Sequence, residues 1–249
     1  MNRLLAVLLL FVSLEAGAFF RDEVQVNDNG KTVDITVEKL TVKQPAPTVI
    51  LAHTCAGIIR SMDVQQWGYN INRWGYNVVF PDSFGPRGYR DICSQTLAVT
   101  AEQRAQDIAA VAEWVKKQPW HRGKIALIGF SHGGRTAMEV SNRTRSSVDL
   151  VVAYFPWCRP IDTSPQVPTQ IHIGSLDDWT PSDRCERIAN TNKNYSVYVY
   201  EGVYHSFDRP APDRVKEGNQ GKKHRLVYDP KAAGLAEERT KLFFEQYLK

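Results

Sequence analysis

The chain has 249 residues, of which 43% are hydrophobic and 23% are charged, and its formal net charge is +4. This length is enough for one large α/β domain and too short for two. The charge is only mildly basic, and the basic run at 222–225 is short enough to be a solvated face, so composition argues against a nucleic-acid partner.

The chain begins with the pattern of a secretory signal peptide. Arg3 precedes an apolar run over 4–14, and Ala-Gly-Ala at 16–18 fits a cleavage site. The apolar run is shorter than the ~20 residues that span a bilayer, and the region has no cysteine for a lipid anchor. We therefore expect residues 1–18 to be a signal peptide and 19–249 to form one domain, secreted or periplasmic and without a stable membrane anchor.

Beyond the signal, apolar strands alternate with amphipathic helices. Two β-rich segments, 24–26 and 32–37, are expected to pair as antiparallel strands that open the sheet. Further strands are predicted at 48–52, 77–80, 125–128, 150–155, 169–173 and 196–200, and helices at 62–74, 100–117, 135–141, 182–189 and 230–247. This alternation predicts an α/β fold, with a mostly parallel central sheet, helices on both faces and ligands bound beyond the carboxyl ends of the strands.

One segment breaks the alternation. Residues 208–229 contain Pro210, Pro212, Gly218 and Gly221 among many charges, with little periodicity. A surface loop is the simpler interpretation, and a mobile flap over the site is the alternative.

The stretch Gly-Phe-Ser-His-Gly-Gly at 129–134 is the most informative motif, because it follows the predicted strand at 125–128 and opens a helix. Gly129 and Gly133 flank Ser131 in the pattern G-x-S-x-G, whose small residues allow the sharp turn of a nucleophile elbow. The pattern alone also arises by chance, so its partners further along the chain decide its meaning.

Two more polar residues follow later strands. Asp177 comes just after one predicted strand and His205 just after the next, which gives the chain order Ser, Asp, His of α/β-hydrolases. In such a triad Ser131 attacks, His205 accepts and returns its proton, and Asp177 orients the imidazole. Asp178 is the alternative acid, and His224 is the alternative base.

A tetrahedral oxyanion needs preorganised hydrogen-bond donors. The elbow offers the backbone N–H of His132, the residue after the nucleophile. The second donor is expected from the loop at 53–57, where the N–H of Cys55 is the preferred candidate. His53, which begins this loop, is expected to shape it rather than to react.

These motifs carry a family resemblance over nearly all of the mature chain. The sequence resembles the dienelactone hydrolase family at His-Thr-Cys-Ala-Gly (53–57), Pro-Asp-Ser-Phe-Gly-Pro-Arg-Gly (81–88), the elbow (129–134), Gly-Ser-Leu-Asp-Asp-Trp-Thr-Pro (174–181) and Tyr-His-Ser-Phe (204–207). The resemblance implies an α/β-hydrolase fold and ester or lactone hydrolysis, and it places the acid at Asp177. Founding members have a cysteine nucleophile and a glutamate in the oxyanion loop, where this chain has Ser131 and Thr54.

Four residues are candidates for binding the substrate. The resemblance implies that Arg209 occupies a position that holds a substrate carboxylate in the family, and Arg87 lies in a second site motif. A guanidinium matches a carboxylate bidentately, so an anionic group on the acid side of the substrate is predicted. Trp179 and Tyr204 follow strand ends, where they are candidates to line an apolar pocket.

Export would place the four cysteines in an oxidising compartment, where disulfides persist. Cys55 and Cys93 lie in loops after successive strands, and Cys158 and Cys185 follow the next two strands after the elbow. Pairing between neighbouring loops predicts bridges from Cys55 to Cys93 and from Cys158 to Cys185. Four free buried thiols are the alternative. The chain has no C-x-x-C or H-E-x-x-H pattern, so no metal site is predicted.

The sequence therefore predicts an exported serine hydrolase that cleaves a small-molecule carboxylic ester or lactone through an acyl-enzyme on Ser131, without a cofactor. A peptidase or amidase with the same triad is one alternative. A non-catalytic binding protein on the same fold is the other, although such a protein would be expected to have lost a triad member. The sequence does not indicate an oligomeric state.

Overall fold

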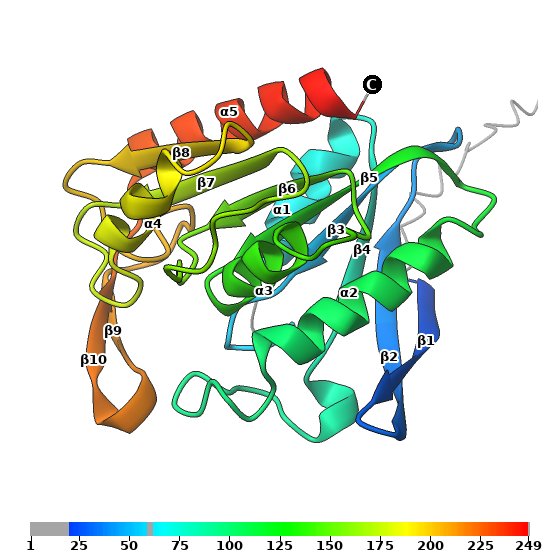
Figure 1. The fold of residues 1–249 in the computed structure, drawn as a ribbon, viewed down its shortest axis with the longest axis horizontal. Coiled ribbons are helices and arrows are strands. Elements are labelled where there is room, and N and C mark those ends of the chain that lie inside the picture. Colours follow the sequence, from blue (N-terminus) through cyan, green and yellow to red (C-terminus); the bar gives the residue numbers. More distant parts are fainter. Residues whose placement is uncertain (1–19, 59–61, 249) are drawn as a thin grey trace, which may run out of the picture.

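The computed structural model describes residues 20–58 and 62–248, so the predicted signal peptide lies outside the described residues. Its centre is a mixed sheet with the strand order β1-β2-β4-β3-β5-β6-β7-β8 (Figure 1). The strands are β1 (Phe20–Asp28), β2 (Lys31–Leu40), β3 (Ala46–Ala52), β4 (Asn77–Asp82), β5 (His121–Phe130), β6 (Leu150–Tyr154), β7 (Thr169–Gly174) and β8 (Tyr195–Tyr200).

The sheet is parallel from β4 through β8, and β2 runs antiparallel to β1 and to β4. β1 and β2 are joined by Asn29 and Gly30, whose φ angles are 53° and 85°. Two successive positive φ angles match the right-handed twist of a two-residue hairpin, and Asn-Gly adopts them readily. The antiparallel opening of the sheet that the sequence predicted is confirmed.

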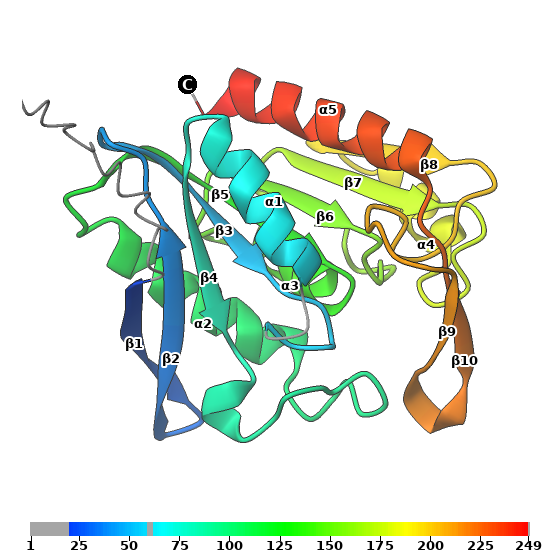
Figure 2. The same cartoon turned by 180° about the vertical axis from the view of Figure 1, so that it is seen from behind.

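Helices cover both faces of the sheet. They are α1 (Met62–Arg73), α2 (Ala101–Val115), α3 (His132–Ser141), α4 (Ser182–Ala189) and α5 (Pro230–Tyr247). α1 and α5 lie on one face, whereas α2, α3 and α4 lie on the other (Figures 1 and 2). Strands between two helical layers are buried on both sides, as every residue of β6 and β7 is, and β6 is a continuous apolar run.

The best-defined helix start is at α2, where the sequence predicted a cap. The Thr100 hydroxyl accepts a hydrogen bond from the Gln103 backbone N–H at 3.1 Å, and the Gln103 side chain accepts one from the Thr100 N–H at 2.9 Å. This reciprocal capping box satisfies two backbone donors that the first turn leaves without helical partners. It fixes where α2 begins, directly beside the loop that leads to the site.

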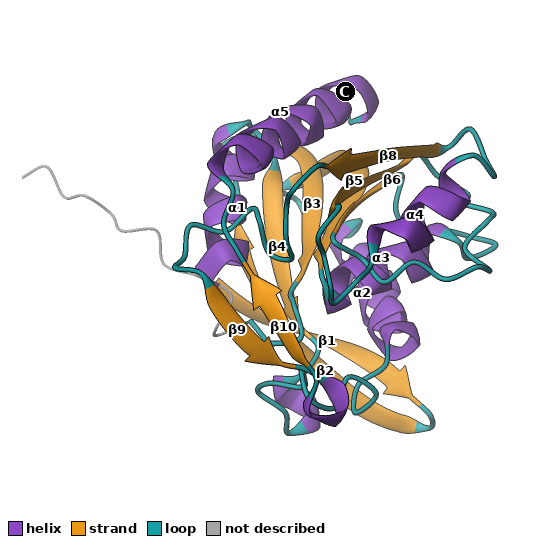
Figure 3. Ribbon diagram, turned by 90° about the vertical axis from the view of Figure 1, so that its left-hand side faces the viewer, coloured by secondary structure: helices purple, strands orange, loops and turns teal. Residues whose placement is uncertain are grey.

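The segment 208–229 differs from the prediction. Instead of an irregular loop, it contains an antiparallel hairpin of β9 (Arg214–Glu217) and β10 (Lys223–Leu226), with a short 3-10 turn at its tip (Asn219–Gly221). The hairpin is a separate two-stranded sheet that projects from the main sheet (Figures 1 and 2), and in the view of Figure 3 it lies in front of the main strands. Each strand has only four residues, and alternation over so short a length is too weak to recognise in a charged sequence.

No helix within residues 20–58 and 62–248 is long and apolar enough to cross a membrane.

Candidate active site

Ser131 lies at the turn between β5 and α3, in the strand–turn–helix setting that the motif predicted. Its φ and ψ angles are 54° and −112°, a conformation that non-glycine residues rarely adopt. A Cβ at Gly129 would come within 2.1 Å of the Gly133 carbonyl oxygen, and one at Gly133 within 2.0 Å of the Ala52 carbonyl oxygen. Only glycine fits at both positions, so the two flanking residues permit the turn that presents the serine.

The structure brings the three predicted triad residues together. The Ser131 Oγ lies 3.0 Å from His205 Nε2, and His205 Nδ1 lies 2.7 Å from Asp177 Oδ2. All three residues are buried. The carboxylate and imidazole come from the loops after β7 and β8, so neighbouring parallel strands deliver both to the carboxyl edge of the sheet.

The Asp177 carboxylate is held by its own loop. Its Oδ1 accepts hydrogen bonds from the backbone N–H groups of Trp179 and Thr180, at 3.0 and 2.7 Å, and its Oδ2 accepts one from the Thr180 hydroxyl at 2.8 Å. The neighbouring carboxylate, on Asp178, is about half exposed and lies 3.4 Å from His224 Nδ1. The two alternatives left open by the sequence, Asp178 and His224, therefore contact each other rather than the serine.

Cys55 and His132, whose backbone N–H groups the sequence suggests as oxyanion donors, line one cavity together with Ser131. Cys55 is bonded to Cys93, and its carbonyl accepts a hydrogen bond from the Ile92 N–H at 2.8 Å. Two contacts fix the loop on one side of the nucleophile, because the disulfide adds a covalent tie to the backbone hydrogen bond. The second disulfide joins Cys158 to Cys185, so both pairings are those expected from neighbouring loops.

The imidazole of His132 is fixed as a neutral ring. Its Nε2 donates to the Thr96 carbonyl at 3.0 Å, and its Nδ1 accepts from the Arg104 guanidinium at 2.9 Å. Burial and the Arg104 charge lower the pKa of His132 to about 3. A ring held at both nitrogens also fixes the backbone of the residue that follows the nucleophile.

Arg104 was not identified from the sequence. This fully buried residue of α2 donates to the His53 carbonyl at 2.8 Å as well as to His132, and its guanidinium lies 5.0 Å from the centre of the Phe84 ring. Burial lowers the pKa of Arg104 to about 9, so the group is still cationic at neutral pH. The helical spacing could have indicated its burial, because Arg104 lies four residues before Ile108 and so shares the buried face of α2 with it.

The structure does not bear out the predicted substrate contact of Arg87. Its guanidinium forms a bidentate pair with Asp107, with both distances 2.9 Å, and donates to Asp28 at 2.8 Å. These bonds join the short turn at 85–87 to α2 and to the end of β1. Arg87 follows β4 as predicted, but its side chain turns toward buried carboxylates and lines neither cavity described next.

Two cavities meet at the candidate nucleophile. The larger has a volume of about 340 Å³ and the smaller about 200 Å³, and Ser131, Cys55 and Trp179 line both. His205 and the predicted Arg209 line only the smaller cavity.

Tyr204, predicted as a pocket residue, lines neither cavity. Its hydroxyl accepts from Arg225 at 3.1 Å, and the same guanidinium lies 4.6 Å from the centre of its ring.

The hairpin of β9 and β10 completes the walls of the site. His224 stacks on Trp179 with ring centres 4.7 Å apart, and Trp179 lies 5.2 Å from the His205 ring. The Asn219 side chain at the hairpin tip donates to the Thr96 hydroxyl at 2.8 Å and accepts from the Thr96 N–H at 3.1 Å. The hairpin therefore contacts both the acid loop and the segment that holds His132.

No group of three or more His, Cys, Asp or Glu residues in the described parts of the chain is arranged to hold a metal ion.

Comparison with known proteins gives a consistent relationship. The sequence profile of the dienelactone hydrolase family matches residues 36–248. The chain is 28% identical over 121 residues to a carboxymethylenebutenolidase of Pseudomonas putida, covering 46% of this chain and 50% of that protein. Carboxymethylenebutenolidase 1 of Cupriavidus pinatubonensis is 27% identical over 117 residues, covering 44% and 49%. The matched part thus spans about half the length of these curated relatives.

Solved structures share the fold. An esterase of Pyrococcus furiosus superposes with a TM-score of 0.67 at 16% identity, covering 93% of this chain and 94% of that chain. A dienelactone hydrolase-like promiscuous phosphotriesterase from metagenomic libraries gives 0.68 at 17% identity, covering 94% and 100%. These likenesses establish the α/β-hydrolase architecture that the sequence predicted.

Proposed function

The chain belongs to the dienelactone hydrolase family, and from this membership we propose that it is an exported serine hydrolase that cleaves a carboxylic ester or lactone through an acyl-enzyme. The observation that carries the proposal is the continuous contact from the Ser131 Oγ through the His205 imidazole to the Asp177 carboxylate. A serine hydroxyl is a weak nucleophile at neutral pH, and this arrangement supplies the base it needs.

In the proposed reaction His205 Nε2 takes the proton of Ser131 as its Oγ attacks the substrate carbonyl. The carbonyl oxygen becomes an anion, stabilised by the backbone N–H groups of Cys55 and His132. As the intermediate collapses, His205 returns the proton to the leaving alcohol and the acyl group stays on Ser131. A water molecule then attacks the carbonyl of the acyl-enzyme while His205 accepts its proton. The bond to the Ser131 Oγ breaks, His205 returns the proton to the serine, and the acid is released. Asp177 orients the imidazole and stabilises its cationic form throughout.

Replacing the nucleophile tests this proposal. Ser131→Ala should abolish hydrolysis of short 4-nitrophenyl esters, because losing the nucleophile of a triad lowers turnover on the order of 10⁶-fold. A fluorophosphonate probe should label the wild type and the control Ser182→Ala, which alters a serine on α4. Labelling that persists in Ser131→Ala would overturn the assignment.

The two adjacent carboxylates provide a matched pair of variants. Asp177→Asn should lower kcat by about 10⁴-fold, because the amide favours the wrong imidazole tautomer. Asp178→Asn should leave kcat within about twofold, since that side chain contacts His224 instead. Steady-state kinetics on one ester compares them, and the opposite order would move the acid to position 178.

Export is part of the proposal, because two disulfides persist best in an oxidising compartment. We expect the mature protein to start at Phe19 and its intact mass to lie about 4 Da below that of the reduced chain, with two hydrogens lost per disulfide. A retained N-terminus or four free thiols after expression with export would contradict this part of the proposal.

The smaller cavity supports an anionic group on the substrate. Arg209, Arg214 and Lys216 line it together with His205, and Lys216 also pairs with Asp91 at 2.9 Å. Because His205 must reach the leaving oxygen, this cavity belongs to the leaving-group side. The anionic group is therefore proposed there, rather than on the acid side that the sequence suggested.

Arg209→Ala tests that placement. On an ester whose alcohol carries a carboxylate, kcat/KM should fall about ten- to a hundredfold, the range for one charge-assisted hydrogen bond. The methyl-capped neutral analogue should lose much less. An equal loss on both substrates would assign Arg209 to support of the histidine loop.

A further inference from the structure

The position of His205 distinguishes the two cavities chemically. This inference rests on the proposed acyl-enzyme, in which His205 protonates the leaving alcohol while the acyl group remains on Ser131. His205 lines the smaller cavity and not the larger, whereas Ser131 lines both. The leaving group therefore occupies the smaller cavity, and the acyl group extends into the larger one. Its volume of about 340 Å³ lies within the range of small-molecule sites.

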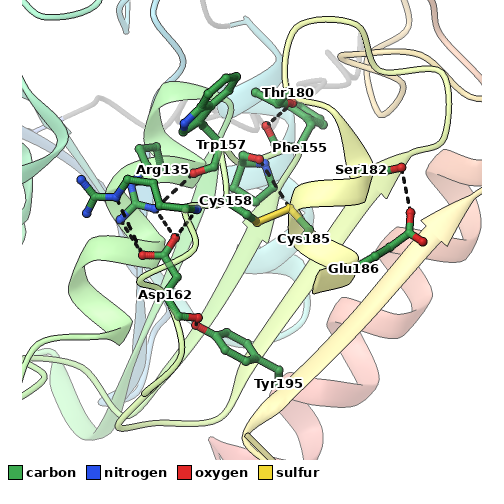
Figure 4. Close-up of a disulfide and its surroundings, with 12 residues drawn as sticks. Arg135, Phe155, Trp157, Cys158, Asp162, Thr180, Ser182, Cys185, Glu186 and Tyr195 are labelled. Carbon is green, nitrogen blue, oxygen red and sulfur yellow. Dashed lines mark hydrogen bonds and ion pairs between the residues drawn. A yellow bond between two sulfur atoms is a disulfide. The ribbon is translucent and has the colours of Figure 1, made fainter. Parts of the chain in front are cut away.

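The larger cavity presents an anchored aromatic ring. Trp157 is 39% exposed although it stands in a wall of this cavity. Its carbonyl accepts a hydrogen bond from Arg135 at 3.1 Å, and the next residue is bonded to Cys185 of α4 (Figure 4). The Arg184 guanidinium, on the same helix, lies 4.2 Å from the centre of the Trp157 ring. The backbone of Trp157 is thus fixed by a hydrogen bond and by the disulfide of the next residue, and its indole is held by the cation–π contact.

The charges around the larger cavity are paired with one another. Arg159 bonds to Glu102 at 2.9 Å and also pairs with Glu139. Arg135 pairs with Asp162 and, at 2.7 Å, with Glu139. Both arginines that line the larger cavity, Arg135 and Arg159, are thus neutralised by carboxylates, so its walls favour an uncharged acyl group.

An exposed apolar surface beside the nucleophile adds to this preference. Leu97 is 83% exposed and lines the same cavity as Trp157. A rigid aromatic ring at a site mouth provides a large contact area at low conformational entropy, and aromatic pairs gain further stability from offset or edge-to-face geometry. We propose that the larger cavity is the acyl subsite and that it selects a planar aromatic acyl group, which packs against Trp157.

Three 4-nitrophenyl esters that share one leaving group test the proposal. Their acyl groups are acetyl, 3-cyclohexylpropanoyl and 3-phenylpropanoyl. The wild type should prefer the phenyl ester to the cyclohexyl ester, because the two are of similar size and only one is planar. In Trp157→Ala the ratio of kcat/KM for the phenylpropanoyl and acetyl esters should fall about tenfold. Trp157→Phe should restore most of the ratio.

Leu176→Ala is the matched control, since Leu176 is another exposed apolar residue that lines neither cavity. It should leave the ratio unchanged. An unchanged ratio in Trp157→Ala, or a wild type that prefers the cyclohexyl ester, would overturn the subsite. A general loss of fold in Trp157→Ala would lower kcat/KM similarly on all three esters. In that case the acyl preference of Trp157→Phe tests the subsite.

A binding measurement separates this inference from the proposed function. Calorimetry of the neutral probe 3-phenylpropanamide with Ser131→Ala should show saturable binding, weakened about tenfold by adding Trp157→Ala. If the probe binds in this way but the wild type hydrolyses none of the esters, the subsite is supported and the proposed function is overturned. If the wild type hydrolyses the acetyl ester but neither probe binding nor acyl preference depends on Trp157, the proposed function is supported and the subsite is overturned.

Discussion

At the scale of single residues, the buried guanidinium of Arg104 lies next to the two segments of the proposed oxyanion site. Its guanidinium contacts the carbonyl of His53, at the start of the Cys55 loop, and the ring of His132. It therefore touches both segments whose backbone N–H groups are proposed to bind the oxyanion. A preorganised positive charge in a buried site stabilises developing negative charge more than it would in water.

Replacing Arg104 should consequently affect turnover more than substrate binding. Arg104→Met should lower kcat about ten- to a hundredfold with little change in KM, because it removes charge-assisted hydrogen bonds that hold the oxyanion segments. A boronic acid inhibitor, which mimics the tetrahedral anion, should bind more weakly by a similar factor. Arg104→Lys, which keeps the charge, should recover part of the loss.

Arg87→Lys serves as the control, since it alters another buried arginine that touches neither oxyanion segment. It should lower the melting temperature while kcat stays near the wild-type value. If Arg87→Lys and Arg104→Met lower kcat equally, the effect of Arg104 would be one of general stability.

The sequence predicted which polar residues follow which strands, but not where every side chain points. Ser131, Asp177 and His205 could be found because a strand end fixes a loop position and the motif limits the local geometry. Arg87 also follows a strand, yet its long side chain turns back toward Asp107, a carboxylate that is distant in the sequence. Arg104 was missed because a charged residue on a helix is ordinarily exposed.

At the scale of elements, the two disulfides close chain segments of similar length but lie beside different parts of the site. The first closes a separation of 38 residues and the second one of 27, so the chain-entropy model gives them nearly equal stabilisation. Only the first includes Cys55, in the proposed oxyanion loop. Only the second lies next to Trp157, in the wall of the larger cavity.

Removing each disulfide should therefore separate stability from chemistry. The double variants Cys55→Ala/Cys93→Ala and Cys158→Ala/Cys185→Ala should each lose about 2–4 kcal/mol in the free energy of unfolding, measured by urea denaturation. The first should also lower kcat on the acetyl ester, whereas the second should chiefly alter the preference among acyl groups. Equal kinetic effects from both would show that neither tie acts locally.

Elements with many regular residues were predictable, and the short hairpin was not. The closing helix was predicted at 230–247, which are its bounds in the structure, because it has eighteen residues and a clear start after Asp229. The hairpin instead depends on contacts across more than forty residues, such as His224 with Trp179 and Asn219 with Thr96. Local sequence carries little of that information.

At the scale of the whole molecule, the fold buries histidines that must remain neutral. His172 in β7 lies within the core, where its Nδ1 accepts from the Tyr200 hydroxyl and its Nε2 donates to Gln170, both at 2.8 Å. Burial lowers the pKa of His172 to about 3, and burial likewise holds the pKa of His53 well below its usual range. With His132, the sheet and its loops bury three such rings.

These rings make the stability of the protein depend on pH. An unfolded histidine titrates near ~6.5, so between about pH 6.5 and 3 the unfolded chain binds protons that the folded chain excludes. The free energy of unfolding should therefore be fully retained above pH 6.5 and fall as the pH is lowered. Each buried histidine should contribute roughly 1 kcal/mol per pH unit between pH 6 and 5. Urea denaturation followed by circular dichroism across this window measures the slope.

His172→Gln isolates one of these contributions, because the amide can still form hydrogen bonds but does not titrate. The variant is expected to be less stable at pH 7 and to show a slope shallower by roughly 1 kcal/mol per pH unit. Tyr200→Phe removes one hydrogen bond of the same ring while leaving it titratable, so it should lower stability without changing the slope as much. A wild-type slope that survives in His172→Gln would mean that His172 can be protonated in the folded core, and that acid sensitivity arises elsewhere.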